Sequence, residues 1–142
     1  MSPELSRNSL YRVDDRYDYY TDNLGRVDKV EGRLELGQKD RNTYQQVCAG
    51  GDCRGPTDQG GHLIASIFNG PGEGLNLVPM ERLVNQSRYK TLENTWKQAL
   101  LDGKAVDVKI EPVYSGNSKR PDGFKVEYQI DGNITDGFID NY

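Results

Sequence analysis

The chain has one histidine, and the polar residues downstream of it have types and spacings that could support phosphodiester hydrolysis. His62 follows a glycine-rich segment, Asn76 and Asn85 lie nine residues apart, and Glu93 lies eight residues beyond Asn85. An imidazole can accept a proton from water near neutral pH. Amide and carboxylate oxygens suit Mg²⁺, which keeps several of its waters and needs few protein ligands. A metal held there could stabilise the charge on a phosphate and on its leaving oxygen.

These residues resemble the motif of the DNA/RNA non-specific endonucleases with a ββα-metal finger, especially the branch found as C-terminal toxin domains of bacterial polymorphic toxins. The family pattern is a DRGH-type box on a strand, an Asn in an N-x-x-P loop, a metal-binding Asn nine residues later and a helical Glu eight residues after that. In this chain the pattern matches Asp58–His62, Asn76, Asn85 and Glu93. The core of the similarity covers residues 55–100, and a looser similarity to the toxin branch begins near Val27.

The resemblance implies a role for each matched residue. His62 would be the general base, Asn85 would bind the metal directly, and Glu93 would bind it through water. Asn76 would act in the catalytic group by bracing the loop or the histidine, and Asp58 would belong to the same group. A helix beginning near Asn85 would direct its free N–H groups and positive dipole end toward the histidine segment, where they would favour phosphate.

Two departures from the family pattern concern basic residues. Gln59 and an extra glycine stand where the pattern has Arg-Gly directly before the histidine, so the arginine's role must be filled from elsewhere. Lys97 stands one helical turn after Glu93, where the family often has arginine. Lysine is a point charge and cannot hold a phosphate bidentately. Lys97 and Arg88 are nevertheless the candidate phosphate-binding residues.

Each candidate residue also has a structural explanation. A lone histidine is more often structural than catalytic, although the residues downstream of His62 favour a function here. Asn76 and Asp58 could fix turns through their side chains. Asn85 could be a helix N-cap, and Glu93 could be a surface acid.

Composition is compatible with one folded domain that spans residues 1–142. The chain carries 18 Lys and Arg against 22 Asp and Glu, a net charge of −4, whereas nucleic-acid binders are usually basic. The charge is uneven, however, because residues 79–104 have a basic excess and residues 122–142 are acidic. No apolar run is long enough to predict a membrane span, and the N-terminus does not read as a signal peptide.

Hydrophobic periodicity predicts an α+β fold in a single domain. The family resemblance implies an antiparallel sheet with a ββα-metal finger. The apolar stripe of residues 87–101 predicts a helix, with Tyr89 and Trp96 in the core and Gly103 as the stop signal. Residues 1–25 are expected to be an N-terminal arm, 42–46 a helical turn, 49–61 a glycine-rich loop and 55–101 the catalytic core. Strands are predicted at 27–36, 75–78, 106–114 and 124–130, and residues 62–68 as a strand or a strand-to-helix transition.

Cys48 and Cys53 enclose a short flexible segment that could bring the two sulfurs together. Such a disulfide would close a very small ring and would stabilise the fold little through chain entropy. Two free thiols are the simpler interpretation, and both readings stay open here.

The sequence therefore predicts a metal-dependent endonuclease of DNA, with RNA also chemically accessible. One divalent ion is expected, Mg²⁺ first and Mn²⁺ as a substitute. The resemblance further implies a toxin domain delivered as the tail of a larger bacterial protein, acting in the target-cell cytoplasm, monomeric when free and neutralised by a cognate immunity protein. Two alternatives are a catalytically silent nucleic-acid or protein-binding module, suggested by Gln59, and a metal-dependent hydrolase of another substrate.

Overall fold

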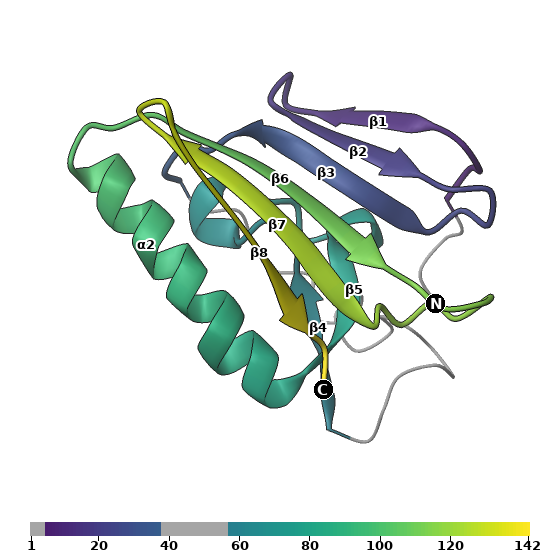
Figure 1. The fold of residues 1–142 in the computed structure, drawn as a ribbon. Helices are drawn as coiled ribbons and strands as arrows, with labels where there is room; N and C mark the ends of the chain where they lie inside the picture. The colour runs from purple at the N-terminus through teal and green to yellow at the C-terminus, as the bar shows by residue number, and fades with distance from the viewer. Residues whose placement is uncertain (1–4, 38–56) are drawn as a thin grey trace.

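The computed structural model describes residues 5–37 and 57–142, and within them the chain forms a curved antiparallel sheet of six strands (Figure 1). The strand order is β1-β2-β3-β6-β7-β8, and all neighbouring pairs are antiparallel. The strands are β1 (Leu10–Val13), β2 (Tyr17–Thr21), β3 (Val27–Arg33), β6 (Val106–Val113), β7 (Gly123–Ile130) and β8 (Asn133–Asp140).

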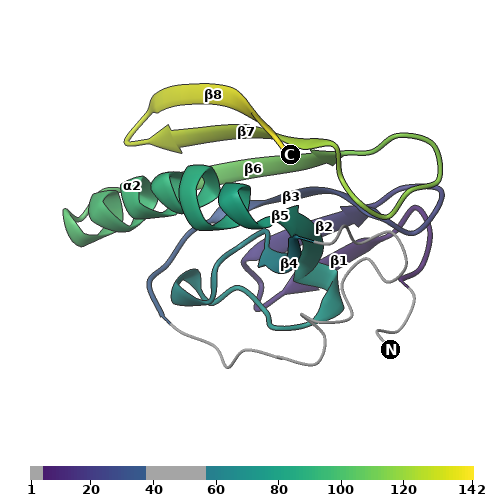
Figure 2. The ribbon, with the colours of Figure 1, turned by 90° about the horizontal axis from the view of Figure 1, so that it is seen from below.

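A second unit with ββα topology interrupts the sheet between β3 and β6. A two-stranded antiparallel hairpin joins β4 (Asp58–His62) to β5 (Leu77–Glu81), with two short 3₁₀ helices, η2 (Ser66–Phe68) and η3 (Gly74–Asn76), between them. A π-helical stretch, η4 (Val84–Arg88), then leads directly into the helix α2 (Tyr89–Leu101). Figure 2 shows the hairpin and α2 on the same side of the six-stranded sheet. The predicted α+β class is therefore confirmed.

The helix α2 forms where the apolar periodicity predicts it. Its buried residues are Tyr89, Glu93, Trp96 and Ala99, which recur at the three- and four-residue spacing of one helix face. Asp102 is the C-cap, and Gly103 follows with φ of +79°, a left-handed conformation that glycine adopts without steric cost.

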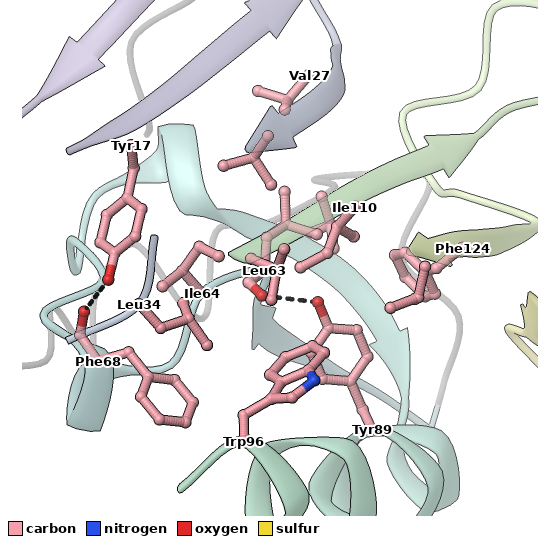
Figure 3. Close-up of a cluster of buried hydrophobic side chains, with 14 of the residues drawn as sticks. Tyr17, Val27, Leu34, Leu63, Ile64, Phe68, Tyr89, Trp96, Ile110 and Phe124 are labelled. Atoms are coloured by element: carbon pink, nitrogen blue, oxygen red, sulfur yellow. Dashed lines mark hydrogen bonds between the residues drawn. The ribbon is translucent and has the colours of Figure 1, made fainter. Parts of the chain in front are cut away.

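The hydrophobic core lies between the large sheet and the ββα unit (Figure 3). Two buried tyrosines cross it and end on backbone carbonyls of the ββα unit. The Tyr17 hydroxyl donates to the Phe68 carbonyl at 2.6 Å, and the Tyr89 hydroxyl donates to the Leu63 carbonyl at 2.6 Å. Burial of a hydroxyl is costly unless it is hydrogen-bonded. The Tyr17 contact therefore fixes the sheet against the ββα unit, and the Tyr89 contact fixes α2 against the segment after β4.

The structure corrects three expectations about the elements. The N-terminal arm is instead a hairpin, because β1 and β2 pair with each other and β2 pairs with β3. The predicted loop at 49–61 extends too far, because β4 begins at Asp58 and contains Gly60 and Gly61. The strand β8 was not predicted, although it pairs along its whole length with β7.

Other predictions hold with small changes. Of the region predicted as a strand or a strand-to-helix transition, His62 ends β4 and residues 66–68 form a 3₁₀ helix. The helical turn at 42–46 and both cysteines lie outside the described residues. In the parts of the chain that the structure describes, no helix has the length and apolar character needed to cross a bilayer.

Candidate active site

His62 is the last residue of β4, pairs with Leu77 of β5 and is 9% exposed. The residue before it must be small, because a Cβ atom on Gly61 would lie 2.8 Å from Cβ of Met80. Glycine therefore lets β4 and β5 approach closely where the strand delivers the histidine. The next residue, Leu63, accepts the hydrogen bond from Tyr89. His62 therefore lies at the end of a strand, and the residue after it is hydrogen-bonded to Tyr89 at the start of α2.

Asn76 is fully buried and uses its whole amide group to hold the turn that follows His62. Its Oδ1 accepts hydrogen bonds from the Ile64 amide at 2.9 Å and from the Tyr19 hydroxyl at 2.7 Å. Its Nδ2 donates to the Ile64 carbonyl at 2.7 Å and to the Pro71 carbonyl at 2.9 Å. With these four bonds, Asn76 is placed to brace the loop beside the histidine and not to contact a substrate.

Asn85 lies in the π-helical stretch η4 and is half-buried. Its Nδ2 donates a hydrogen bond of 2.8 Å to Oε1 of Gln59 on β4, three residues before His62. Short π-helical segments inside helices are frequent at functional sites. This contact joins the predicted metal ligand to the strand that carries the predicted base.

Glu93 lies on the buried face of α2, one turn after Tyr89. Burial raises the pKa of Tyr89 well above its ordinary value, and the negative charge of Glu93 raises it further. The carboxylate of Glu93 therefore lies close enough to raise the pKa of the Tyr89 hydroxyl, which is hydrogen-bonded to the Leu63 carbonyl. Contrary to the surface-acid alternative, Glu93 is a buried acid on the apolar face of α2.

Asp58 opens β4 and forms a bidentate ion pair with Arg120, in the loop between β6 and β7. Arg120 Nε and Nη2 donate to the two carboxylate oxygens at 2.7 and 3.1 Å, and the bond with Asp58 is the main reason that the pKa of Arg120 is raised. Both oxygens of Asp58 are thereby engaged. The pair anchors the first residue of β4 to the loop between β6 and β7.

The same corner holds a buried asparagine that ties the end of β8 to the hairpin. Arg120 Nη2 donates to the Asn141 carbonyl at 2.7 Å. The Asn141 side chain donates to the carbonyls of Pro79 and Pro121 at 3.0 and 2.7 Å and accepts from the Glu81 amide at 2.8 Å. Sequence analysis found neither Arg120 nor Asn141, because each lies about 60 residues from its partners on the hairpin.

The start of the helix does not offer the free N–H groups that were expected to bind phosphate. The Glu81 carboxylate accepts hydrogen bonds from the amides of Leu83 and Val84, at 2.6 and 3.4 Å. A carboxylate is stabilised at this position by the helix dipole. A phosphate at this helix start would be repelled by the negative charge of Glu81 and would have to displace its carboxylate from these amides. The prediction that free N–H groups of the helix start bind phosphate was therefore wrong.

Arg88 and Lys97 are both exposed to solvent. Arg88 ends η4 and also lines a groove between the start of α2 and β8. Lys97 lies one turn beyond Glu93 on α2. Their charges are accessible to a phosphate that approaches from solvent.

The donor set is compatible with a hard divalent cation. Among the described residues, no group of three or more His, Cys, Asp and Glu side chains is close enough together to form a dedicated metal cage. Mg²⁺ does not need such a cage, since it is usually bound through one or two protein oxygens and several waters. Because Nδ2 of Asn85 is bonded to Gln59, the amide oxygen remains as its ligating atom. Glu93 adds a carboxylate on the same ββα unit.

The ββα unit carries a histidine at a strand end and places Asn85 and Glu93 on the helical segment that follows. The sequence model described as DNA/RNA non-specific endonuclease matches residues 7–132. The chain therefore belongs to the DNA/RNA non-specific endonuclease family.

Curated relatives and solved structures extend this result. The chain is 40% identical over 136 residues to the type VII secretion system protein EssD of Staphylococcus aureus, an alignment that covers 91% of this chain and 22% of that protein. The chain thus spans about a fifth of the length of the curated relatives it matches.

Its fold is similar to that of NucA from Streptococcus agalactiae, whose structure contains a bound magnesium ion. The TM-score is 0.74 at 17% identity, with 98% of this chain and 82% of that chain covered. An extracellular endonuclease has a TM-score of 0.59 at 19% identity, with 100% and 92% covered.

Proposed function

We propose that the chain is a metal-dependent, non-specific endonuclease that hydrolyses phosphodiester bonds of DNA. The observation that carries the proposal is the placement of His62, Asn85 and Glu93 on one ββα unit. Two hydrogen bonds hold that placement, from Asn85 to Gln59 and from Tyr89 to Leu63.

In this proposal His62 accepts a proton from the water that attacks the phosphorus. Asn85 would bind one divalent ion through Oδ1, and Glu93 would hold the same ion through water. A bound ion would neutralise charge on the phosphate and on the leaving 3′-oxygen. Arg88 and Lys97 would contact phosphates of the substrate from the exposed side of the helix. Because water is the nucleophile and no ribose hydroxyl is used, RNA is a second chemically accessible substrate.

The magnesium ion in the NucA structure supports Mg²⁺ as the metal, with Mn²⁺ as a substitute. The amide and carboxylate oxygens of the candidate site support the same choice, because Mg²⁺ prefers oxygen ligands.

The similarity to EssD supports a place in bacterial secretion. We propose that the chain is the toxin domain of a longer secreted protein, monomeric when free, and that it acts in the cytoplasm of a target cell.

A cell that makes such a nuclease needs protection from it, so we also propose a dedicated immunity protein. An acidic inhibitor that covers the site beside Arg88 and Lys97 is the favoured docking mode, and its association should slow as salt rises. The alternative is a basic inhibitor bound at the acidic C-terminal segment. The test is to mix the chain with the product of the adjacent gene and to measure binding and cleavage together.

The first test of the nuclease proposal is a plasmid-nicking assay of the wild-type chain and of His62→Ala, with Mg²⁺ and with EDTA. Loss of a general base typically slows a reaction by about 10²–10⁴-fold, so the variant should lose almost all cleavage. Wild-type cleavage should also fall as the pH drops below neutrality, because a protonated imidazole cannot accept a proton.

Asn94→Ala is a matched control, because Asn94 is exposed on the same helix beside Glu93. It should cleave like the wild type. If His62→Ala keeps more than roughly a tenth of the wild-type rate, His62 is not the base. If the wild type binds DNA without cleaving it, the chain is a binding module on this scaffold.

A further inference from the structure

The carboxamide of Asn85 has two chemically different ends, and only one of them can bind a cation. The oxygen is an acceptor and a metal ligand, whereas the NH₂ group is a donor and repels a cation. The two ends have nearly the same shape, so the side chain alone does not determine which end faces the ion. A neighbouring group must select the orientation.

Gln59, whose own carboxamide presents its oxygen end to Asn85 in this structure, supplies that selection. Its Oε1 accepts the hydrogen bond from Asn85 Nδ2 at 2.8 Å. We propose that Gln59 is a positioning residue for metal binding, which fixes the NH₂ end of Asn85 toward β4 so that Oδ1 is presented to the ion. This inference rests on the proposed function and assigns a role to a residue that departs from the family pattern.

Both partners of this hydrogen bond belong to elements that are held from outside the bond. Gln59 pairs with Met80 of β5 across the hairpin. The residue before it, Asp58, accepts hydrogen bonds from Arg120 at both carboxylate oxygens. Asn85 lies in η4, near a helix start capped by the Glu81 carboxylate. A ligand whose orientation is set in advance loses less conformational freedom when the ion binds. The Gln59 contact is therefore a means of preorganisation.

The test measures Mn²⁺ binding to the substrate-free chain by titration calorimetry, so the result does not depend on turnover. Gln59→Met keeps the length of the side chain and removes the acceptor. Gln59→Glu keeps an acceptor at the same place. Partners that orient metal ligands typically change affinity by about 10–100-fold. Gln59→Met should therefore weaken Mn²⁺ binding at least tenfold, and Gln59→Glu should bind at least as tightly as the wild type.

A double-mutant cycle separates orientation from general effects on the site. In Asn85→Asp both ends of the side chain are oxygens, so either orientation presents a ligand. Adding Gln59→Met to Asn85→Asp should then change the Mn²⁺ dissociation constant less than about threefold, although the same substitution costs tenfold or more beside Asn85. Thermal unfolding of each variant, measured without metal, checks that the fold is retained.

Equal losses from Gln59→Met in the wild type and in the Asn85→Asp variant would overturn the inference, because Gln59 would then act without orienting the amide. Wild-type affinity in Gln59→Met would overturn it as well. In both cases the wild type would still bind Mn²⁺ and cleave DNA, so the proposed function would stand. A wild-type chain that neither takes up Mn²⁺ nor cleaves DNA would instead overturn the proposed function, and the inference with it.

Discussion

At the scale of single residues, the site separates groups that would touch the ion from groups that orient them. Asn85 is half-buried and linked to β4, whereas Glu93 is buried on the helix face. A direct ligand contributes more to metal affinity than a residue that acts through water. The two side chains should therefore differ in what their removal does to metal activation.

We expect Asn85→Ala to raise the Mg²⁺ concentration needed for half-maximal cleavage more than Glu93→Gln does. Glutamine is used at 93 because it keeps the volume of a buried side chain and avoids a cavity. The measurement is a Mg²⁺ titration of the initial nicking rate for each variant and for the wild type. The same midpoint for Asn85→Ala and the wild type would rule out direct ligation by Asn85.

The family resemblance, which rests on residue spacing, predicted His62, Asn85 and Glu93 as site residues, and all three lie on the ββα unit. It could not identify the groups that orient or anchor them. In the sequence, Gln59 is a departure from the family motif. Its hydrogen bond to Asn85 depends on the relative position of β4 and η4, which the sequence does not reveal. Arg120 is 62 residues from Asp58, a separation that no local pattern encodes.

At the scale of elements, the strand β4 is held at its first residue by a charge pair that spans the fold. The Asp58 side chain is 2% exposed in the pair with Arg120. Removing one partner of a buried pair leaves a buried charge uncompensated, which typically costs about 3–5 kcal/mol. Arg120→Ala should therefore lower the free energy of unfolding by about 3 kcal/mol, since Arg120 itself is partly solvated. Urea unfolding monitored by the fluorescence of Trp96 measures the change.

Arg33→Ala is the matched control for this prediction. Arg33 forms a bidentate pair of similar geometry with Asp107, at 2.9 and 3.1 Å, but both side chains are exposed. Exposed ion pairs contribute little to stability, so the unfolding midpoint should hardly move. If the two variants lose the same stability, burial of the Asp58 pair is not what matters.

The elements that the sequence predicted are those with one buried and one exposed face. The strand β6 alternates buried and half-buried residues along its whole length, and α2 has one apolar stripe. The strand β8 lacks that signal because its first six residues are exposed. Its signal lies in the turn before it, where Asp131-Gly132 has positive φ at both residues, typical of a tight hairpin. The strand β2 was overlooked because tyrosines occupy both of its faces.

At the scale of the whole molecule, the hydrogen bonds of Tyr17 and Tyr19 connect the sheet to the ββα unit. These tyrosines and Tyr89 are buried, and their burial should make the free energy of unfolding fall at alkaline pH. Burial raises the pKa of Tyr17 to about 12 and raises the pKa values of Tyr19 and Tyr89 well above the ordinary value. The same groups titrate near 10 when the chain is unfolded. Their contribution is fully present below pH 10 and is lost as the pH rises toward and through the folded-state values, because the unfolded chain then binds fewer protons.

The urea midpoint should therefore fall steadily between about pH 10 and 12. Tyr17→Phe should make that fall shallower, because one of the groups responsible no longer ionises. Tyr142→Phe should leave the slope unchanged, since Tyr142 is 81% exposed. The slope is the decisive quantity, because Tyr17→Phe also removes the hydrogen bond to Phe68 and lowers the midpoint at every pH.

The network around Asn141 also has a consequence for the order of events during synthesis. His62, Asn85 and Glu93 leave the ribosome well before Arg120 and Asn141, which hold the hairpin at Asp58, Pro79 and Glu81. A nascent chain can therefore contain every residue of the proposed reaction while its hairpin is still unclamped. We expect the proposed cleavage to begin only after Asn141 has left the ribosome and bonded to the hairpin.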